Sequence, residues 1–288
     1  MSSVPVVEPR ISAGLRTDTH PSDVADTFPV RAPTRPALFR GLASIRLVVL
    51  DVDDTIVLNE AVSFEIENGA LDLVGRLPMS RATHRATWGM PLLEAMEYRS
   101  PGVDPEAFGI AFREVFFRYH AAGLVDVVPQ QNLVAIDVLR GEGRQVMILT
   151  SRSAIEVEHL IVESAPLASR ISATYHLDRT RHAKPDPRVF DELLADTGID
   201  PADCLYVGDT PGDAAAANGA GIPFVACLES ELRSREQFDG HQVAAYLATF
   251  PDIVGAVLRL ERGRRAARRP ADNGSVISNR VARSASAM

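Results

Sequence analysis

The chain has 288 residues, enough for one sizeable core and a smaller accessory unit. With 46% apolar and 24% charged residues it has the composition of a globular protein, which excludes fibrous and wholly disordered classes. Its formal charge of -8 argues against nucleic acid as the main ligand, although the segment 262–283 is strongly basic. We therefore expect a folded protein that acts on something other than a nucleic acid.

Both ends differ in composition from the middle. Residues 1–43 are rich in Pro, Ser, Thr and Arg and lack the continuous apolar stretch of a secretory signal, which predicts a disordered leader. Residues 262–288 have no periodic apolar face, which predicts a disordered basic tail. No run of 18 apolar residues is present, so no membrane span or membrane partner is expected. Cys204 and Cys227 follow or precede apolar segments and are expected to be buried free thiols, typical of a cytoplasmic protein.

Between these ends, short apolar runs alternate with amphipathic segments. This alternation predicts an α/β fold with a mainly parallel sheet, because such strands are covered by helices on both faces. The predicted strands are residues 47–50, 145–149, 204–207 and 223–226, and the predicted helices are residues 105–119, 133–140, 153–163, 186–197 and 212–220.

The first two strands are separated by about 90 residues, far more than one crossover helix needs. We predict that residues 60–128 are a helical insertion into a core made of residues 44–59 and 129–261. An insertion that directly follows a polar loop is placed to cover that loop as a lid.

Acidic side chains follow the first strand and the third. Asp51-Val52-Asp53-Asp54-Thr55 ends the first strand, and Asp209 and Asp213 come after the third. In open parallel sheets, ligands bind at the carboxyl ends of the strands, so the two loops can meet on one cation, and carboxylate oxygens suit Mg²⁺. The first loop taken alone is equally compatible with a helix cap or a turn.

Groups suited to phosphate follow the second strand and precede a helix. Thr150 and Ser151 end the second strand with hydroxyl and backbone donors. Lys184 lies in Lys184-Pro185-Asp186-Pro187 and is the only lysine among 30 basic residues. In a chain so biased toward arginine, a lysine here indicates a need for a compact point charge.

These residues resemble the haloacid dehalogenase superfamily, chiefly its phosphatases. All four family signatures occur in order between Leu47 and Cys227: the loop 51–55, Thr150, Lys184-Pro185, and Gly208-Asp209 followed by Asp213. The resemblance implies a Rossmann-like core with a helical cap inserted between the first two signatures. The 33 residues between Thr150 and Lys184 leave no room for a cap at the alternative position.

The resemblance also implies a role for each site residue. Asp51 would attack phosphorus and form an aspartyl phosphate, and Asp53 would carry the proton. Thr150, Ser151 and Lys184 would hold the phosphoryl oxygens. Mg²⁺ would be bound by Asp51, the backbone carbonyl of Asp53, and Asp209, with Asp213 as a ligand or just behind the ligands.

Individual residues favour or disfavour several alternative functions. The acid/base at Asp53 disfavours a haloalkanoate dehalogenase, and the absence of a cap lysine disfavours a phosphonate-cleaving relative. A phosphomutase acting on a sugar phosphate shares every core residue and stays open. A signalling receiver domain has its lysine last in the chain, whereas Lys184 precedes Asp209, and a binding protein without activity is disfavoured because no site position is degraded.

The expected substrate is a small phosphorylated metabolite such as a sugar, cyclitol or glycolate phosphate. The segment Thr87-Trp88-Gly89-Met90-Pro91-Leu92 resembles the substrate loop of phosphoglycolate phosphatase-like enzymes. Trp88 is interpreted as filling the cap core in preference to stacking on substrate. Arg81, Arg85 and Arg99 are candidates for binding a substrate carboxylate or second phosphate, although solvated arginines are the commoner case.

Overall fold

The computed structural model describes residues 45–268. The predicted leader, residues 1–43, and residues 269–288 of the predicted tail lie outside this range. Within residues 45–268, no helix is both long enough and apolar enough to cross a membrane.

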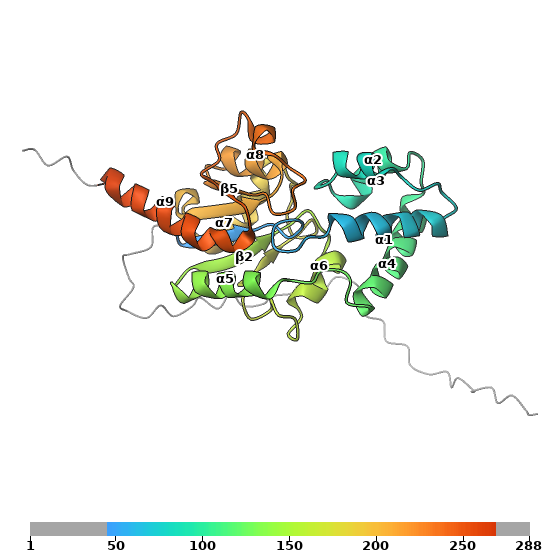
Figure 1. Ribbon diagram of the computed structural model, residues 1–288, viewed down its shortest axis with the longest axis horizontal. Helices are drawn as coiled ribbons and strands as arrows, with labels where there is room; N and C mark the ends of the chain where they lie inside the picture. Colours follow the sequence, from blue (N-terminus) through green and yellow to red (C-terminus); the bar gives the residue numbers. More distant parts are fainter. Residues whose placement is uncertain (1–44, 269–288) are drawn as a thin grey trace, which may run out of the picture. The chain divides into compact units, whose positions relative to one another are not determined.

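The centre of the fold is a parallel sheet with helices around it (Figure 1). Within the described residues this sheet has six strands, in the order β3-β2-β1-β4-β5-β6. The pairing register sets Leu50 opposite both Ile148 and Val207, so β1, β2 and β4 end side by side. The strands are β1 Leu47–Leu50, β2 Gln145–Leu149, β3 Thr174–Tyr175, β4 Cys204–Gly208, β5 Phe224–Cys227 and β6 Ala245–Leu247. The predicted α/β class is confirmed, and the three polar loops of the sequence begin at neighbouring points of one edge.

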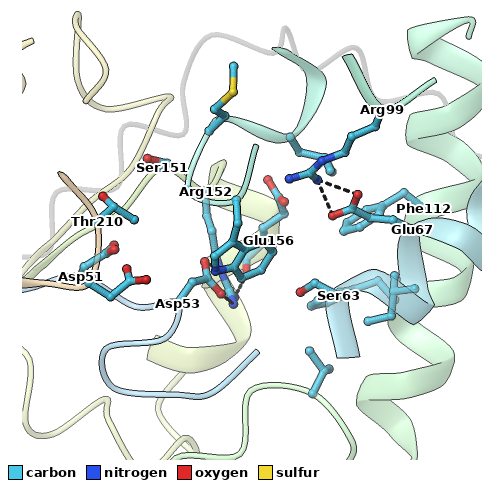
Figure 2. A pocket seen from close by; sticks show the side chains of 18 of the residues that line it. Asp51, Asp53, Ser63, Glu67, Arg99, Phe112, Ser151, Arg152, Glu156 and Thr210 are labelled. Carbon is cyan, nitrogen blue, oxygen red and sulfur yellow. Dashed lines mark hydrogen bonds and ion pairs between the residues drawn. The ribbon is translucent and has the colours of Figure 1, made fainter. Parts of the chain in front are cut away.

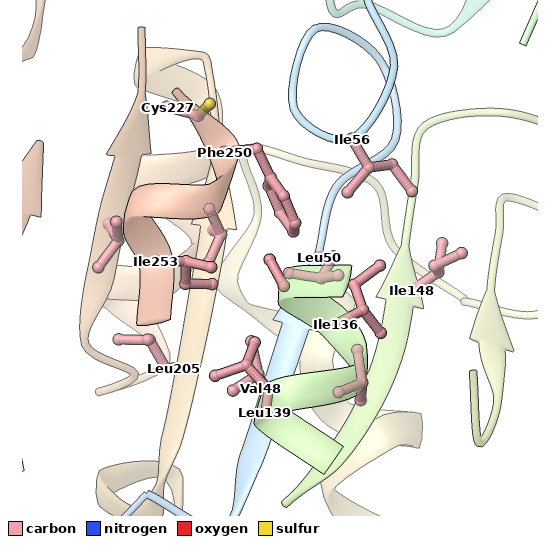
Figure 3. Close-up of a cluster of buried hydrophobic side chains, with 14 of the residues drawn as sticks. Val48, Leu50, Ile56, Ile136, Leu139, Ile148, Leu205, Cys227, Phe250 and Ile253 are labelled. Carbon is pink, nitrogen blue, oxygen red and sulfur yellow. The ribbon is translucent and has the colours of Figure 1, made fainter. Parts of the chain in front are cut away.

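The alternation of side chains along each strand builds two separate layers of core. Val48 and Leu50 point to one face, where they pack with residues of α5 and α9 (Figure 3). Leu47 and Val49 point to the other face, toward α7 and α8. Because both faces are covered, β1, β4 and β5 are buried along their whole length.

The helices of the sheet domain are α5 Gln130–Gly141, α6 Ala154–Ile161, α7 Asp191–Thr197, α8 Pro211–Gly219 and α9 Ile253–Arg268. The helix predicted over 186–197 is a short 3-10 segment, Pro187–Phe190, followed by α7. A second difference concerns residues 262–268, which were predicted to belong to a disordered tail. They are part of α9, which continues to Arg268, seven residues beyond the predicted end of the core at residue 261. Ala and Arg are good helix formers, and they extend a helix whose first turns are held by the core.

Four further helices lie between β1 and β2, and we call them the inserted helices: α1 Glu60–Leu73, α2 Arg81–Ala86, α3 Leu92–Arg99 and α4 Pro105–Ala121. They bury a cluster of their own, which includes Ile66, Phe108 and Phe116. The start of α4 shows why the chain turns helical there: Pro105 takes the first position and the Asp104 side chain accepts from the Glu106 amide.

Candidate active site

Asp51 is the first residue after β1 and lies at the centre of the carboxyl edge of the sheet. Its amide donates to the Val207 carbonyl at 2.9 Å, so the backbone continues the sheet while the side chain enters the loop region. The Nζ atom of Lys184 lies 3.0 Å from its Oδ1. Burial raises the pKa of Asp51 to about 7, although the Lys184 ammonium acts in the opposite direction.

The second acidic loop is shaped by the start of α8. The Thr210 hydroxyl accepts from the Asp213 amide, and the Asp213 carboxylate accepts from the Thr210 amide and hydroxyl, which makes a capping box. Pro211 occupies the first turn of the helix, where a missing N–H costs nothing. The loop that carries Asp209 is therefore fixed from both ends, by β4 and by this cap.

Lys184 is held in place by a buried polar cluster. Its Nζ lies 2.8 Å from Asp213 Oδ1 and donates to the Tyr206 hydroxyl at 3.1 Å, while that hydroxyl donates to the same Asp213 oxygen at 2.8 Å. Burial by itself would lower the pKa of Lys184, but Asp213 and Asp51 raise it above its ordinary value. The ammonium is thus charged and aimed at Asp51.

Three carboxylates converge at this edge: Asp51, Asp209 and Asp213 each offer an oxygen within 4.8 Å of the others. The Asp209 Oδ2 atom is buried and has no hydrogen-bond partner within the described residues. Burial raises the pKa of Asp209 well above its ordinary value. Such an orphaned buried oxygen beside a second carboxylate fits a hard divalent cation, whereas both Asp213 oxygens are already occupied by Lys184, Tyr206 and Thr210.

The hydroxyl residues after β2 occupy different positions. Thr150 continues the sheet, with its amide donating to the Tyr175 carbonyl at 3.0 Å and its hydroxyl accepting from the Arg152 amide. Ser151 lines the pocket, and its buried hydroxyl has no partner among the described residues. Of the two, Ser151 has the hydroxyl with unused hydrogen-bonding capacity.

Asp53 forms an ion pair with Arg152, a residue outside the four family signatures. Arg152 Nε and Nη2 donate to the two oxygens of Asp53 at 2.9 and 2.6 Å (Figure 2). The same guanidinium binds both oxygens of Asp126 at 2.9 and 2.7 Å. Asn59 donates to both carboxylates, so the residue just before α1 and the residues after α4 are linked through one cation.

The inserted helices complete a cavity that is open to solvent. Trp88 lines it and donates from Nε1 to Asp54 Oδ2 at 2.6 Å. Burial raises the pKa of Asp54 to about 6. The interpretation of Trp88 as filler of the cap core is wrong: the indole is half-buried and bridges the inserted helices to the acidic loop.

The three arginines considered as candidates for anion binding fall into two groups. Arg99 lines the cavity, but Nη1 donates to both oxygens of Glu67 at 2.8 and 2.6 Å. Arg81 and Arg85 are not among the lining residues and contact Glu60 at 2.6 and 3.4 Å. None of the three presents an unpaired charge to the cavity.

Arg152, Asp126 and Tyr206 are among the polar residues of the site that the sequence did not reveal. Arg152 stands two positions after Thr150, which is the only sequence signal that it lies near the site. Asp126 has a φ of +58°, and a left-handed aspartate marks a local turn that periodicity does not report. Tyr206 sits in a strand that reads as plain core.

Comparison with known proteins agrees with this arrangement. Residues 48–227 match the family described as haloacid dehalogenase-like hydrolase. A probable phosphatase of Dickeya dadantii, IndB, is 27% identical over 218 residues, covering 73% of this chain and 92% of that protein. A phosphoglycolate phosphatase of Xylella fastidiosa is 27% identical over 184 residues, covering 64% of this chain and 80% of that enzyme.

Among solved structures, CbbY from Rhodobacter sphaeroides in complex with xylulose-(1,5)-bisphosphate shares the fold. It has a TM-score of 0.64 at 18% identity, with 74% of this chain and 99% of that chain covered. The family match spans well over half of the 288 residues and includes the three converging aspartates and Lys184. The chain therefore belongs to the haloacid dehalogenase-like hydrolases.

Proposed function

We propose that this protein is a Mg²⁺-dependent phosphatase that hydrolyses a small-molecule phosphomonoester through an aspartyl phosphate on Asp51. The observation that carries the proposal is the convergence of Asp51, Asp209 and Asp213 within 4.8 Å, with the Lys184 ammonium 3.0 Å from Asp51. A carboxylate nucleophile next to a fixed cation and an unsatisfied carboxylate is the arrangement that phosphoryl transfer requires.

Mg²⁺ would be held by Asp51 and Asp209, with the backbone carbonyl of Asp53 as a further ligand. The support is the Asp209 oxygen that has no partner among the described residues. Bound there, the cation would neutralise charge on the phosphoryl group and favour the ionised form of Asp51. We assign Asp213 to positioning of Lys184 and of the α8 loop, because both its oxygens are occupied.

In the proposed reaction, an Asp51 carboxylate oxygen attacks phosphorus, the bond from phosphorus to the ester oxygen breaks, and Asp53 gives its proton to the departing alkoxide. Water then attacks the phosphorus of the aspartyl phosphate and Asp53 takes the proton of that water. The bond from phosphorus to the Asp51 oxygen breaks, which restores the Asp51 carboxylate and releases inorganic phosphate. Lys184, Ser151 and Thr150 would hold the phosphoryl oxygens. Asp53 must exchange its contact with Arg152 to take up a proton, since both its oxygens now accept from that guanidinium.

We further propose that residues 60–128 act as a cap whose loop at Trp88 closes over the substrate. The hydrogen bond from Trp88 to Asp54 supports this role, since it joins the inserted helices to the loop that carries Asp51 and Asp53. The cytoplasmic location predicted from the sequence stays a prediction.

The test is release of inorganic phosphate from a panel of phosphomonoesters. The wild-type protein is expected to release phosphate with Mg²⁺ and to stop when EDTA removes the cation. Asp51→Asn is expected to lower turnover by at least about a thousandfold, because the amide cannot act as nucleophile. Net release of phosphate also separates hydrolysis from phosphoryl transfer within a sugar phosphate.

Asp72→Asn is the matched control, because it makes the same change at an exposed position of α1. It should retain wild-type turnover. Full turnover in Asp51→Asn, or turnover unaffected by EDTA, would contradict the proposal.

A further inference from the structure

The cations that line the cavity are already neutralised by carboxylates of the protein itself. These cations are Arg99, Arg152 and Lys184. Lys184 contacts Asp51 and Asp213, and Arg152 uses all five of its N–H groups on Asp53, Asp126 and the Glu156 carbonyl. In this resting arrangement, a substrate that carries a second anionic group would therefore find no unpaired positive charge among the described residues that line the cavity.

Arg99 is the cation best placed to meet the part of a substrate away from phosphorus. Figure 2 shows Arg99 and Glu67 facing each other on the opposite side of the cavity from Asp51. The side chains of Arg99 and Glu67 are only 2% and 3% exposed, and Arg99 also donates to the hydroxyl and carbonyl of Thr87. Glu67 balances the charge of Arg99, and most of the N–H groups of Arg99 already donate to protein oxygens. Arg99 therefore adds no net positive charge to the cavity wall.

Apart from the Ser63 hydroxyl, the Trp88 indole and Gly89, the rest of the wall supplied by residues 60–128 is apolar. The apolar side chains are those of Ile66, Met90, Leu92, Phe112, Phe116 and Val125. Five carboxyl groups line the same cavity, and the proposed Mg²⁺ would be taken up by the first and last of them and by the phosphoryl group: Asp51, Asp53, Glu67, Glu156 and Asp209. Burying an unpaired substrate carboxylate among these groups is unfavourable, because it would lose hydration without gaining a partner.

From this we infer that the substrate is a phosphomonoester whose leaving alcohol is uncharged and partly apolar, with Glu67 and Arg99 as the residues that exclude a second anion. The inference rests on the proposed phosphatase function and names the substrate class of that same site. It separates this chain from an enzyme specialised for a carboxylate-bearing ester or a bisphosphate.

The experiment compares esters that differ only in charge. The wild-type protein with Mg²⁺ is given 2-phosphoglycolate and its carboxamide, and 4-carboxyphenyl phosphate and its carboxamide, and kcat/KM is measured from phosphate release. The carboxamide of each pair is expected to be preferred by about tenfold or more, since the carboxylate meets no unpaired cation. Equal use of both members, or preference for the carboxylate, would overturn the inference while leaving the phosphatase function intact.

Absence of phosphate release from all four esters and from the wider panel would instead overturn the proposed function. The two failures are therefore distinguishable. The wild-type comparison needs no variant, so it decides the inference even where a substituted protein does not fold.

A variant tests the assigned residues directly. Glu67→Gln keeps the shape of the side chain but leaves the Arg99 charge unbalanced, and it is expected to raise the carboxylate-to-carboxamide ratio of kcat/KM by about tenfold. Glu97→Gln makes the same charge change at an exposed position of α3 and should leave the ratio unchanged. An unchanged ratio in folded Glu67→Gln, with its circular dichroism spectrum intact, would remove Glu67 and Arg99 from the assignment.

Discussion

Gly208 shows how tightly the second acidic loop is packed against the end of β4. A Cβ atom at this position would lie 2.6 Å from Asp213 Cγ and 2.7 Å from Asp213 Oδ2. Since that carboxylate is fixed by Thr210, Tyr206 and Lys184, it has no room to give way. The glycine is therefore required by contact and not by backbone conformation.

We accordingly expect Gly208→Ala to lower kcat by more than about tenfold and the free energy of unfolding by about 1–3 kcal/mol. Steady-state phosphate release and urea unfolding measure the two effects. Gly141→Ala is the control, because a Cβ there meets nothing within 4 Å and alanine favours the helix. Wild-type activity in Gly208→Ala would show that the loop can rearrange freely.

The position of each site residue in the sequence explains why some of them could be predicted and others could not. Asp51, Asp209 and Lys184 were predictable because each follows or precedes an apolar strand or a proline pair, so its place at the edge of the sheet follows from chain order. The partner of Asp53 was not predictable. Arg152 and Asp53 are 99 residues apart in the sequence, and nothing in either local sequence indicates that they pair. Which of 29 arginines is buried is settled by packing alone.

At the scale of elements, the chain leaves the sheet for the inserted helices at one point and returns to it at another. Both connecting segments contact the same ion-pair network. Asn59 precedes α1, Asp126 follows α4, and both contact the group that includes Arg152. His159 of α6 also lies 2.7 Å from Asp126. The Asp126 side chain is 2% exposed, so this is a buried network whose members depend on one another.

Asp126→Asn is expected to lower the free energy of unfolding at pH 7 by about 3 kcal/mol, because it leaves Arg152 short of a buried counter-charge. Burial alone would raise the pKa of Asp126, but Arg152 and His159 hold it well below its ordinary value of 3.8. A lowered pKa means that the wild-type advantage is complete above pH 3.8 and is lost as the pH falls further.

Urea unfolding of both proteins at pH 7, 4 and 3 measures this dependence. The difference in free energy of unfolding between the wild type and Asp126→Asn should be largest at pH 7 and clearly smaller at pH 3. Asp137→Asn, which breaks an exposed pair with Arg170, should cost less than about 1 kcal/mol at pH 7. A gap that stays constant down to pH 3 would contradict the assigned ion pair.

The strands that the sequence failed to predict are short and lie at the two edges of the sheet. β3 has two residues and β6 has three, and neither is an apolar run long enough to stand out from a loop. They pair because β2 and β5 offer open edges, which is a property of the assembled sheet. The four central predictions succeeded because strands covered on both faces must be apolar throughout.

On the scale of the whole molecule, the described residues contain separate apolar cores. Two flank the sheet, and the third belongs to the inserted helices. Phe108 is fully buried in the third core and packs against Phe112. Damage to this core should therefore destabilise the inserted helices before it affects the sheet.

We expect Phe108→Ala to cost about 3–5 kcal/mol, with that cost falling on the inserted helices. Trp88 is the only tryptophan of the chain and reports on these helices, whereas far-ultraviolet circular dichroism reports on the whole fold. In the variant, the fluorescence transition should come at lower urea than the circular dichroism transition. Phe117→Ala, at a position of α4 that is 51% exposed, should leave both curves close to wild type. Coincident transitions in Phe108→Ala would show that the cores unfold as one.

The lone lysine has a practical consequence. The chain presents a single side-chain amine to acylating reagents, and that amine lies in the candidate site beneath Asp51 and Asp213. As a buried ammonium it should resist amine-directed biotinylation in the native protein and become labelled when the site is disrupted. One modified peptide in a mass spectrum would thus report the integrity of this site, without a substrate and without any engineered tag.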